Sequence, residues 1–288
     1  MSVRAASLNQ HDLWSIKGVG VKPEHFPLGI ASDVSGVTDD GREVIVHPLV
    51  SSGALGRNGE LLDPARRMLA DVIGGGAADT VLVPERNLIN KPAEIDFVSA
   101  AALPTAWMTA YRMLFTAGGT KPGDTVLVQG AAGGVATALI ALAAAAGIRV
   151  WVAGRDAGRL EAAQEFGAHA TFLTGERLPE RVDVVLETVG EATFDHSMRS
   201  VRPGGRIVVA GATTGAAVNI DLNRVFLQHV SIVGTSLGTI DDLRSVVSLV
   251  STTGVRPVID STYALNDAAA AVARLSSGEA IGKVVIVP

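Results

Sequence analysis

Cysteine is absent from this chain of 288 residues. Its absence excludes disulfide bonds, thiolate zinc sites, iron–sulfur clusters and a cysteine nucleophile. An excess of positive charge is also lacking, because the formal net charge is −5. No basic field is available to attract a phosphate backbone, and this argues against a nucleic-acid-binding protein.

Lysine is scarce, and the chain shows neither internal repeats nor a low-complexity tract. Only 5 of the 24 basic residues are lysine, a bias that favours a GC-rich bacterial genome over a functional explanation. No apolar run follows a basic start at the N-terminus, so no signal peptide is visible and a cytoplasmic location is expected. The length and the hydrophobic content of 48% favour two domains with buried cores.

Charged residues are missing from residues 125–148, a stretch long enough to span a bilayer. Gly130, Gly133 and Gly134 interrupt it. The residues before these glycines are β-branched, and the residues after them are rich in alanine and leucine. A strand, a glycine turn and a helix explain this pattern better than a membrane-spanning helix.

The two halves of the chain differ in pattern. Residues 1 to about 90 resemble strands and loops, whereas strand and helix signals alternate after Pro92. The expected elements are helix 99–115, strand 125–128, helix 135–146, strand 149–152, helix 157–166, strand 182–186, helix 193–201, strand 206–210, strand 230–233, helix 240–252, helix 266–277 and strand 283–287. Such alternation predicts an α/β fold with a doubly wound parallel Rossmann sheet.

The strongest local signal is the turn from Gly130 through Gly133 and Gly134 to Ala136, between a strand and a helix. The first glycine permits a tight turn, and the next lets the backbone approach a diphosphate. A small third residue lets the helix pack on the strand. The helix N-terminus offers N–H groups to the phosphates. This pattern predicts a dinucleotide site; the alternative is a close-packed turn over an empty crevice.

The residues at the end of the expected strand 149–152 indicate which nicotinamide coenzyme, NAD(H) or NADP(H), the site would bind. An NAD site has a carboxylate about 20 residues past the glycine pattern, near Gly154 here. No acid is found at that strand tip; Arg155 follows at once and Arg159 lies one helical turn on. Because a guanidinium suits a 2′-phosphate, we expect NADP(H) rather than NAD(H). The alternative is that both arginines are solvated residues at the start of a helix capped by Asp156.

Several separated motifs stand in order along the chain: residues 5–14 and 32–37, the helix 103–111, the glycine turn 130–135, residues 256–260 and the closing segment 282–286. Together they resemble the medium-chain dehydrogenase/reductase superfamily, and in particular its zinc-free, quinone-oxidoreductase-like branch. The resemblance covers essentially the whole chain. It implies a β-rich GroES-like catalytic domain of residues 1–96, completed by residues 256–288, and a Rossmann NADP-binding domain of residues 97–255. Several members are homodimers joined through the last Rossmann strand, so a homodimer through Val230–Val233 is expected.

The glycine turn, the arginines and the family resemblance together predict the coenzyme-binding residues. They are Thr109, Gly130, Ala132, Gly133, Gly134, Val135, Gly154, Arg155, Arg159, Val189, Gly190, Gly211, Ala212, Leu237, Gly238 and Lys283. Lys283 is alternatively a charge at the rim. By resemblance, Asn9 lies beside the nicotinamide ribose and the substrate cleft. His11 falls where relatives place a hydroxyl of the proton relay, and is a candidate acid; the alternative is a surface or cap histidine.

Two departures from the family pattern stand out. The positions that hold catalytic zinc in zinc-dependent members are Asn9, Ser32/Asp33 and Thr105 here, and amide and hydroxyl groups are poor zinc ligands. The structural-zinc loop corresponds to the cysteine-free residues 51–71. We therefore predict no metal. Relatives also carry further residues before the equivalent of Val3, so the GroES-like domain is expected to lack its first strands.

These observations predict a zinc-independent NADP(H)-dependent oxidoreductase that reduces a quinone or an α,β-unsaturated carbonyl, with Asn9 and His11 in the cleft. The alternatives are a reductase of aldehydes or ketones and a cofactor-binding homologue without turnover. A methyltransferase using the same crevice fits the glycine turn less well. The expected partner is a small-molecule substrate, with neither nucleic acid nor membrane. Glu187 is expected to be a solvated strand end, and His47 and His196 receive no role.

Overall fold

The computed structural model describes residues 1–52, 59–71 and 73–288. The chain forms two compact units: unit 1 contains residues 1–108 and 238–288, and unit 2 contains residues 109–237. The chain passes between them twice, at Met108–Thr109 and at Leu237–Gly238. Among the described residues, no helix combines the length and the apolar character that a bilayer crossing demands.

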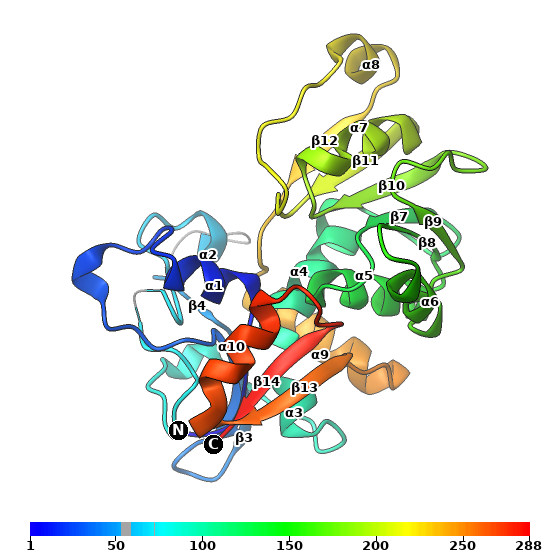
Figure 1. Cartoon of the computed structure of the whole chain (residues 1–288). Helices are drawn as coiled ribbons and strands as arrows, with labels where there is room; N and C mark the ends of the chain where they lie inside the picture. The colour runs from blue at the N-terminus through cyan, green and yellow to red at the C-terminus, as the bar shows by residue number, and fades with distance from the viewer. Residues whose placement is uncertain (53–58, 72) are drawn as a thin grey trace. The chain divides into compact units, whose positions relative to one another are not determined.

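Unit 2 is built on a six-stranded sheet whose neighbouring strands are all parallel. Its strands are β7 (Thr125–Gln129), β8 (Arg149–Gly154), β9 (Ala170–Leu173), β10 (Val182–Glu187), β11 (Val201–Val209) and β12 (Ser231–Gly234). The spatial order is β9-β8-β7-β10-β11-β12 (Figure 1). Numbered within the unit, this is the order 3-2-1-4-5-6 of a doubly wound Rossmann fold. The predicted sheet is confirmed, although the short, half-buried strand β9 gave no clear signal.

The helices of unit 2 explain the long uncharged stretch. They are α5 (Gly134–Ala145), α6 (Ala157–Glu165), α7 (Glu191–Ser200), α8 (Leu222–Leu227), and the segments α4 (Met108–Tyr111) and η4 (Arg112–Ala117) at its start. Every residue of β7 is buried, and α5 is buried continuously from Ala136 to Ala143. A helix that is apolar all round packs inside a protein, so a central strand followed by a core helix needs no charged residue.

Unit 1 contains a second, mixed six-stranded sheet. Its strands are β1 (Ser2–Ser7), β2 (Asp33–Val37), β3 (Glu43–Val46), β6 (Leu88–Asn90), β13 (Ile259–Ala264) and β14 (Lys283–Val287). The order β13-β14-β1-β2-β3-β6 places β1 between β14 and β2, so both of its edges are paired. The C-terminal strands thus complete the sheet that the N-terminal residues begin.

Shorter elements surround this sheet. They are α1 (Gln10–Ile16), η1 (Pro23–His25), β4 (Leu49–Val50), α2 (Gly59–Leu62), β5 (Arg67–Met68), η2 (Glu85–Asn87), α3 (Phe97–Ala101), η3 (Leu103–Trp107), α9 (Ile240–Thr253), η5 (Leu265–Asp267) and α10 (Ala268–Ser276). Helix α3 packs on β1 and β2, and α9 packs against η3. Residues 97–108 and 238–255 therefore belong to unit 1, whereas the sequence analysis placed them with the Rossmann domain. Helical periodicity shows which face of a helix is buried but does not show which sheet it covers.

The segment after Phe97 is helical but irregular. The expected single helix 99–115 is divided into α3, the π-helical turns η3 and η4, and the short α4. Pro104 lacks an N–H and cannot fit a regular helix interior. The wide π-turn accommodates it and leaves the N–H of Thr105 free to donate to Asp33 Oδ1, at 3.0 Å.

Candidate functional site

The glycine turn has the geometry of an anion-binding loop. Strand β7 ends at Gln129, and Gly130 has a φ of +95°, a left-handed conformation that favours glycine. Helix α5 begins at Gly134, and its N-cap Gly133 supplies no side-chain cap. The first α-helical bond runs from the N–H of Thr137 to Gly133 O, so the amides of residues 134–136 have no intrahelical acceptor. These amides and the helix dipole form a site for a phosphate.

The loops after β7, β10 and β11 meet beside this turn. A Cβ at Gly130 would lie 3.6 Å from Val189 Cγ2, and one at Gly190 would lie 2.9 Å from Ala212 Cα. A Cβ at Gly211 would lie 3.0 Å from a backbone oxygen of the loop after β10. Strands β7 and β10 are neighbours where the strand order reverses, which is where open α/β sheets bind ligands. The structure therefore brings these predicted residues together at the end of the sheet where the site is expected.

The end of β8 adjoins the same turn. A Cβ on the buried Gly154 would lie 3.3 Å from Ala131 Cβ, and Arg155 follows with an exposed side chain. Asp156 caps α6 by accepting a hydrogen bond from the N–H of Arg159 at 2.9 Å. The alternative interpretation was correct about this cap. The cap uses the carboxylate of Asp156, however, and leaves the Arg155 guanidinium at the surface.

Not all of the predicted coenzyme residues lie in unit 2. Thr109 is buried at its first position, and Leu237 ends it with a φ of +48°. Gly238 and Lys283 belong to unit 1. The Gly238 carbonyl oxygen lies 3.0 Å from Nε2 of the buried His47, whose Nδ1 lies 3.2 Å from Leu49 O. Burial lowers the pKa of His47. The sequence analysis gave this histidine no role, because its partner is far away along the chain.

In unit 1, the positions that hold zinc in relatives gather around a lysine. We call Asn9, Ser32, Asp33, Thr105 and Lys283 the Asp33–Lys283 cluster. The fully buried Asp33 accepts hydrogen bonds on Oδ2 from Asn9 Nδ2, at 2.8 Å, and from Lys283 Nζ, at 3.2 Å. Its Oδ1 accepts from the N–H and the hydroxyl of Thr105. The cluster is a closed network around a buried ion pair.

The side-chain N–H donors of Lys283 and Asn9 are fully used. The three N–H bonds of the Lys283 ammonium go to Leu8 O, Asn9 Oδ1 and Asp33 Oδ2, and the side chain is 3% exposed. Asn9 Nδ2 donates to Ser32 Oγ and Asp33 Oδ2. Lys283 therefore has no proton left for a phosphate, and Asn9 has none for a substrate oxygen. Both residues are therefore members of the cluster, and their expected contacts with coenzyme and substrate stay predictions.

The same geometry tests whether a zinc ion fits. Zinc needs deprotonated ligands with free lone pairs. Here the only carboxylate is Asp33, which already accepts four hydrogen bonds and pairs with a buried ammonium. Across the described residues, no group of three His, Cys, Asp or Glu side chains could hold a metal ion. This donor set does not fit zinc.

His11 lies in the first turn of α1, next to a buried carboxyl group. Asp12 completes a capping box: its Oδ2 accepts from the N–H of Asn9 and its Oδ1 from the N–H of Ala31, each at 2.7 Å. Burial raises the pKa of Asp12 to about 6. His11 is half-buried, and its Nδ1, which is itself buried, has no hydrogen-bond partner among the described residues. The cap is formed by Asn9 and Asp12 and does not use the imidazole of His11.

One expectation in unit 2 was wrong. Glu187, expected to be a solvated strand end, is fully buried at the end of β10 and accepts hydrogen bonds from two backbone amides and two hydroxyls. One sequence feature could have indicated this environment: Glu187 stands at the carboxyl end of an apolar strand, and Thr-Val-Gly follows it.

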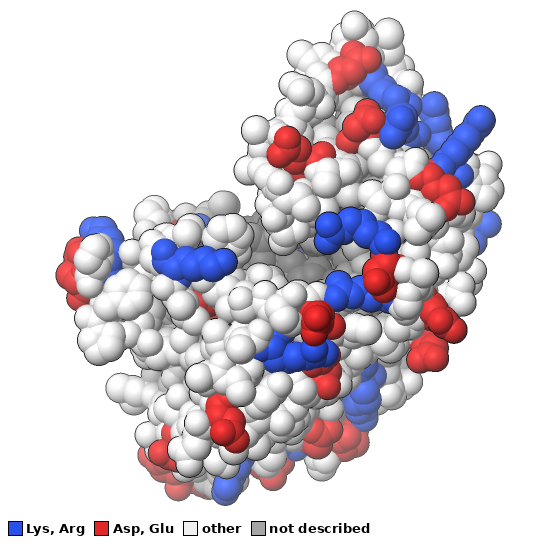
Figure 2. Space-filling view, viewed as in Figure 1, with Lys and Arg blue, Asp and Glu red and all other residues white. Residues whose placement is uncertain are grey.

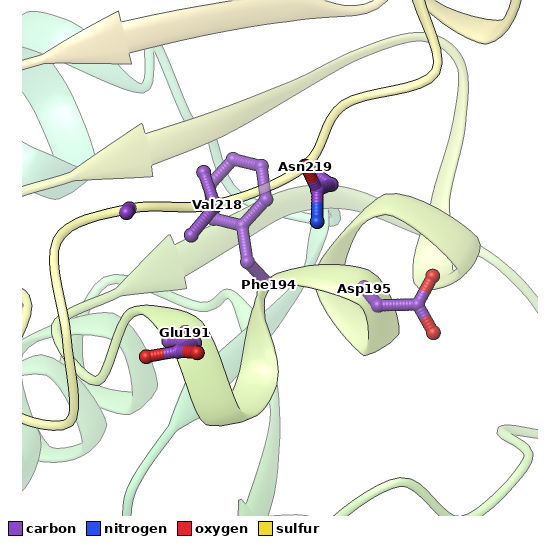
Figure 3. A pocket seen from close by; sticks show the side chains of 6 residues that line it. Glu191, Phe194, Asp195, Val218 and Asn219 are labelled. Carbon is purple, nitrogen blue, oxygen red and sulfur yellow. The ribbon is translucent and has the colours of Figure 1, made fainter.

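A separate pocket of about 270 Å³ lies between α7 and the chain after β11. Figure 3 shows Phe194 and Val218 side by side, with Glu191 and Asp195 on α7. None of the predicted coenzyme residues lines this pocket. Its two carboxylates would repel a phosphate, so we do not assign the coenzyme to it.

Comparisons with known proteins agree with this fold. The family model described as zinc-binding dehydrogenase matches residues 134–252. A zinc-type alcohol dehydrogenase-like protein of Leptosphaeria maculans is 31% identical over 231 residues, which cover 74% of this chain and 64% of that protein. A quinone oxidoreductase of Homo sapiens is 25% identical over 308 residues, which cover 99% of this chain and 88% of that protein.

A solved structure extends the likeness to the whole fold. The crystal structure of an NAD-dependent alcohol dehydrogenase has a TM-score of 0.92 and 30% identity, covering 100% of this chain and 90% of that chain. The doubly wound sheet and its glycine turn define an α/β protein of the dehydrogenase type. The chain belongs to the medium-chain dehydrogenase/reductase superfamily of oxidoreductases, in its branch of quinone oxidoreductases and alcohol dehydrogenase-like proteins.

Proposed function

We propose that this protein is a zinc-independent, NADP(H)-dependent oxidoreductase that reduces a quinone or an α,β-unsaturated carbonyl compound. The observation that carries the proposal is the glycine turn. The amides of residues 134–136 have no intrahelical acceptor, and they lie between β7 and β10, where the strand order of the sheet reverses. A Cβ at Gly133 would meet no atom within 4 Å, so a diphosphate has room to approach the backbone. When bound, a nicotinamide coenzyme supplies a hydride to the substrate.

The residues of unit 2 would bind and orient the coenzyme. The amides of residues 134–136 bind the diphosphate, and the loops at Val189–Gly190 and Gly211–Ala212 line the other half of the crevice. The sequence also predicts His11, in unit 1, as a proton donor to the substrate oxygen, and this role stays a prediction. His11 is the remaining candidate of the two predicted catalytic residues, because the Asp33–Lys283 cluster uses both N–H bonds of the Asn9 amide.

The exposed Arg155 supports NADP(H) over NAD(H). It stands directly after β8, where an NAD site has a carboxylate and this chain has Gly154. An arginine pairs with a 2′-phosphate through charge-assisted hydrogen bonds. We therefore expect Arg155→Ala to weaken NADPH binding about tenfold and to leave NADH binding unchanged, since such a bond contributes about 1.5–3 kcal/mol. Calorimetric titration of both coenzymes measures this effect.

The matched control is Arg181→Ala, which removes an exposed arginine that contacts Gln228. Tighter binding of NADH than NADPH by the wild-type protein, with no effect of Arg155→Ala, would contradict the coenzyme assignment. NADPH oxidation with quinones, enones and aldehydes then separates the substrate classes. Turnover of aldehydes alone would favour the alcohol dehydrogenase-type reductase, and binding without any turnover would favour a non-catalytic homologue.

We also propose a homodimer formed through the β12 end of unit 2. Strand β12 is an edge strand of the sheet (Figure 1). Helix α8, which precedes β12 in the chain, exposes more than half of each of Leu222, Phe226 and Leu227. Acidic and basic side chains are interspersed over the face of the molecule in Figure 2, without an extended region of one sign. A second copy related by a twofold axis would pair the strand edge with itself and cover the apolar helix.

Charge placed on α8 should therefore separate the subunits. We expect the double variant Phe226→Asp, Leu227→Asp to sediment as a monomer, and the wild-type protein to sediment as a dimer at micromolar concentration. Leu82→Asp is the control, because Leu82 is 90% exposed and belongs to unit 1. A monomeric wild-type protein would contradict the dimer.

A further inference from the structure

Glu187 is a buried carboxylate that the proposed reaction does not use. Its Oε1 accepts hydrogen bonds from the N–H groups of Val189, at 2.8 Å, and Gly190, at 3.1 Å. Its Oε2 accepts from Ser197 Oγ at 2.6 Å, and Thr193 Oγ1 lies 2.9 Å from both carboxylate oxygens. All of these partners are donors. An ionised carboxylate, which only accepts hydrogen bonds, matches them.

No cation compensates this charge within the described residues. Two arginines near Glu187 in the sequence pair with other carboxylates. Arg199, on α7, pairs with Asp195 at 3.1 Å, and Arg202, just after α7, pairs with Asp183 at 2.6 Å. A fully buried charge without a counter-ion is costly, even when hydrogen bonds surround it.

The groups that face Glu187 add no positive charge. On α7, His196 donates from Nε2 to Glu176 O, at 2.9 Å, and its Nδ1 accepts from Gln129 Nε2, at 3.0 Å. This imidazole is neutral, and burial lowers its pKa further. Gln129 ends β7, and its Oε1 is buried without a partner among the described residues. The neighbourhood of Glu187 is therefore negative, with a carboxylate and an unpaired carbonyl oxygen.

The position of Glu187 in the sheet determines which part of a bound coenzyme its negative charge acts on. A doubly wound sheet binds one mononucleotide in each half. Strands β7–β9 carry the glycine turn and Arg155, so they take the adenosine side of the coenzyme. Strands β10–β12 form the other half, and Glu187 ends the first of these strands and holds the amides of Val189 and Gly190. The carboxylate thus lies on the nicotinamide side of the crevice.

The nicotinamide ring is a cation when oxidised and neutral when reduced. A fixed negative charge in a water-poor region attracts the oxidised ring and has little effect on the reduced one. We propose that Glu187 is a positioning residue that also sets the relative affinity for the two coenzyme forms, favouring NADP⁺ over NADPH. This inference rests on the proposed function, because it requires the coenzyme to bind in this crevice.

The test is Glu187→Gln in the full chain, with dissociation constants measured by calorimetry for NADP⁺ and NADPH. The variant keeps an oxygen for the two amides, and the hydroxyls of Thr193 and Ser197 can accept from its new N–H bonds. We expect the ratio Kd(NADP⁺)/Kd(NADPH) to rise at least threefold. Any general loosening of the loop affects both forms equally and cancels in this ratio.

Ser197→Ala is the matched control, since it removes one hydrogen bond and keeps the carboxylate. It should weaken both forms without changing their ratio. A ratio in Glu187→Gln within twofold of wild type would overturn this inference alone. If Glu187→Gln does not fold, the two dissociation constants of the wild-type protein test the inference. The wild type should bind NADP⁺ at least as tightly as NADPH, and a tenfold preference for NADPH would overturn the inference. Binding of neither form would overturn the proposed function as well.

Discussion

Replacing Gly133 by aspartate should eliminate most coenzyme binding while leaving the fold at least as stable as the wild type. Gly133 is the N-cap of α5, with φ −67° and ψ 160°, an extended conformation that any residue adopts. A Cβ there would meet no atom within 4 Å. Aspartate is among the best N-cap residues and stabilises a helix by about 1 kcal/mol relative to a poor cap, although less relative to glycine.

The same carboxylate would lie where the diphosphate must bind. Repulsion between two charges about 4 Å apart near a protein surface is on the order of 4 kcal/mol. We therefore expect a loss of about 100-fold or more in NADPH affinity, measured by titration, with an unchanged or slightly higher Tm. Gly133→Asn is the control, because asparagine caps the helix equally well without charge. An aspartate variant that binds NADPH within threefold of the wild type would show that the diphosphate binds elsewhere.

Replacing Lys283 by methionine should produce a large loss of stability. The ammonium is 3% exposed and donates all three protons, one of them to the fully buried Asp33. Methionine fills the space of the side chain stem but leaves the carboxylate without its cation. Removing one partner of a buried ion pair costs about 3–5 kcal/mol, and we expect this decrease in the free energy of unfolding in denaturant.

The double variant Asp33→Asn, Lys283→Met separates charge from packing. Because the uncompensated carboxylate is gone, its loss of stability should be smaller than the sum of the two single losses. Lys17→Met is the control at an exposed lysine and should change stability by no more than about 0.5 kcal/mol. If Lys283→Met unfolds like the wild type but binds NADPH poorly, Lys283 contacts the coenzyme as the family resemblance suggested, and the cluster assignment is wrong.

Some expectations of the sequence analysis stay predictions. The preference for NADP(H), the independence of zinc, the homodimer and the cytoplasmic location need the measurements described above or a direct localisation. The structure shows where the predicted site residues lie within each unit. Gly130, Val189, Gly190, Gly211 and Ala212 come together in unit 2, but their contact with a coenzyme remains to be measured.

The sequence by itself determined the features that depend on local order along the chain. Strand β7, the turn at Gly130 and helix α5 are consecutive, so their apolar runs and glycines define them without distant partners. The alternation of strands and helices then determined the parallel sheet, because short crossovers are right-handed and neighbouring elements pack together. The site at the carboxyl end of β7 follows from that arrangement.

The tertiary structure alone decided the environment of each buried polar group. Asp33 pairs with Lys283 across 250 positions of sequence, and Glu187 is enclosed by α7, which folds back over the end of its own strand. Residue patterns record whether a side chain is apolar, but they do not record which distant donor reaches it. Hydrogen bonds extend over about 3 Å, so the role of a buried charge depends on packing that only the folded chain defines.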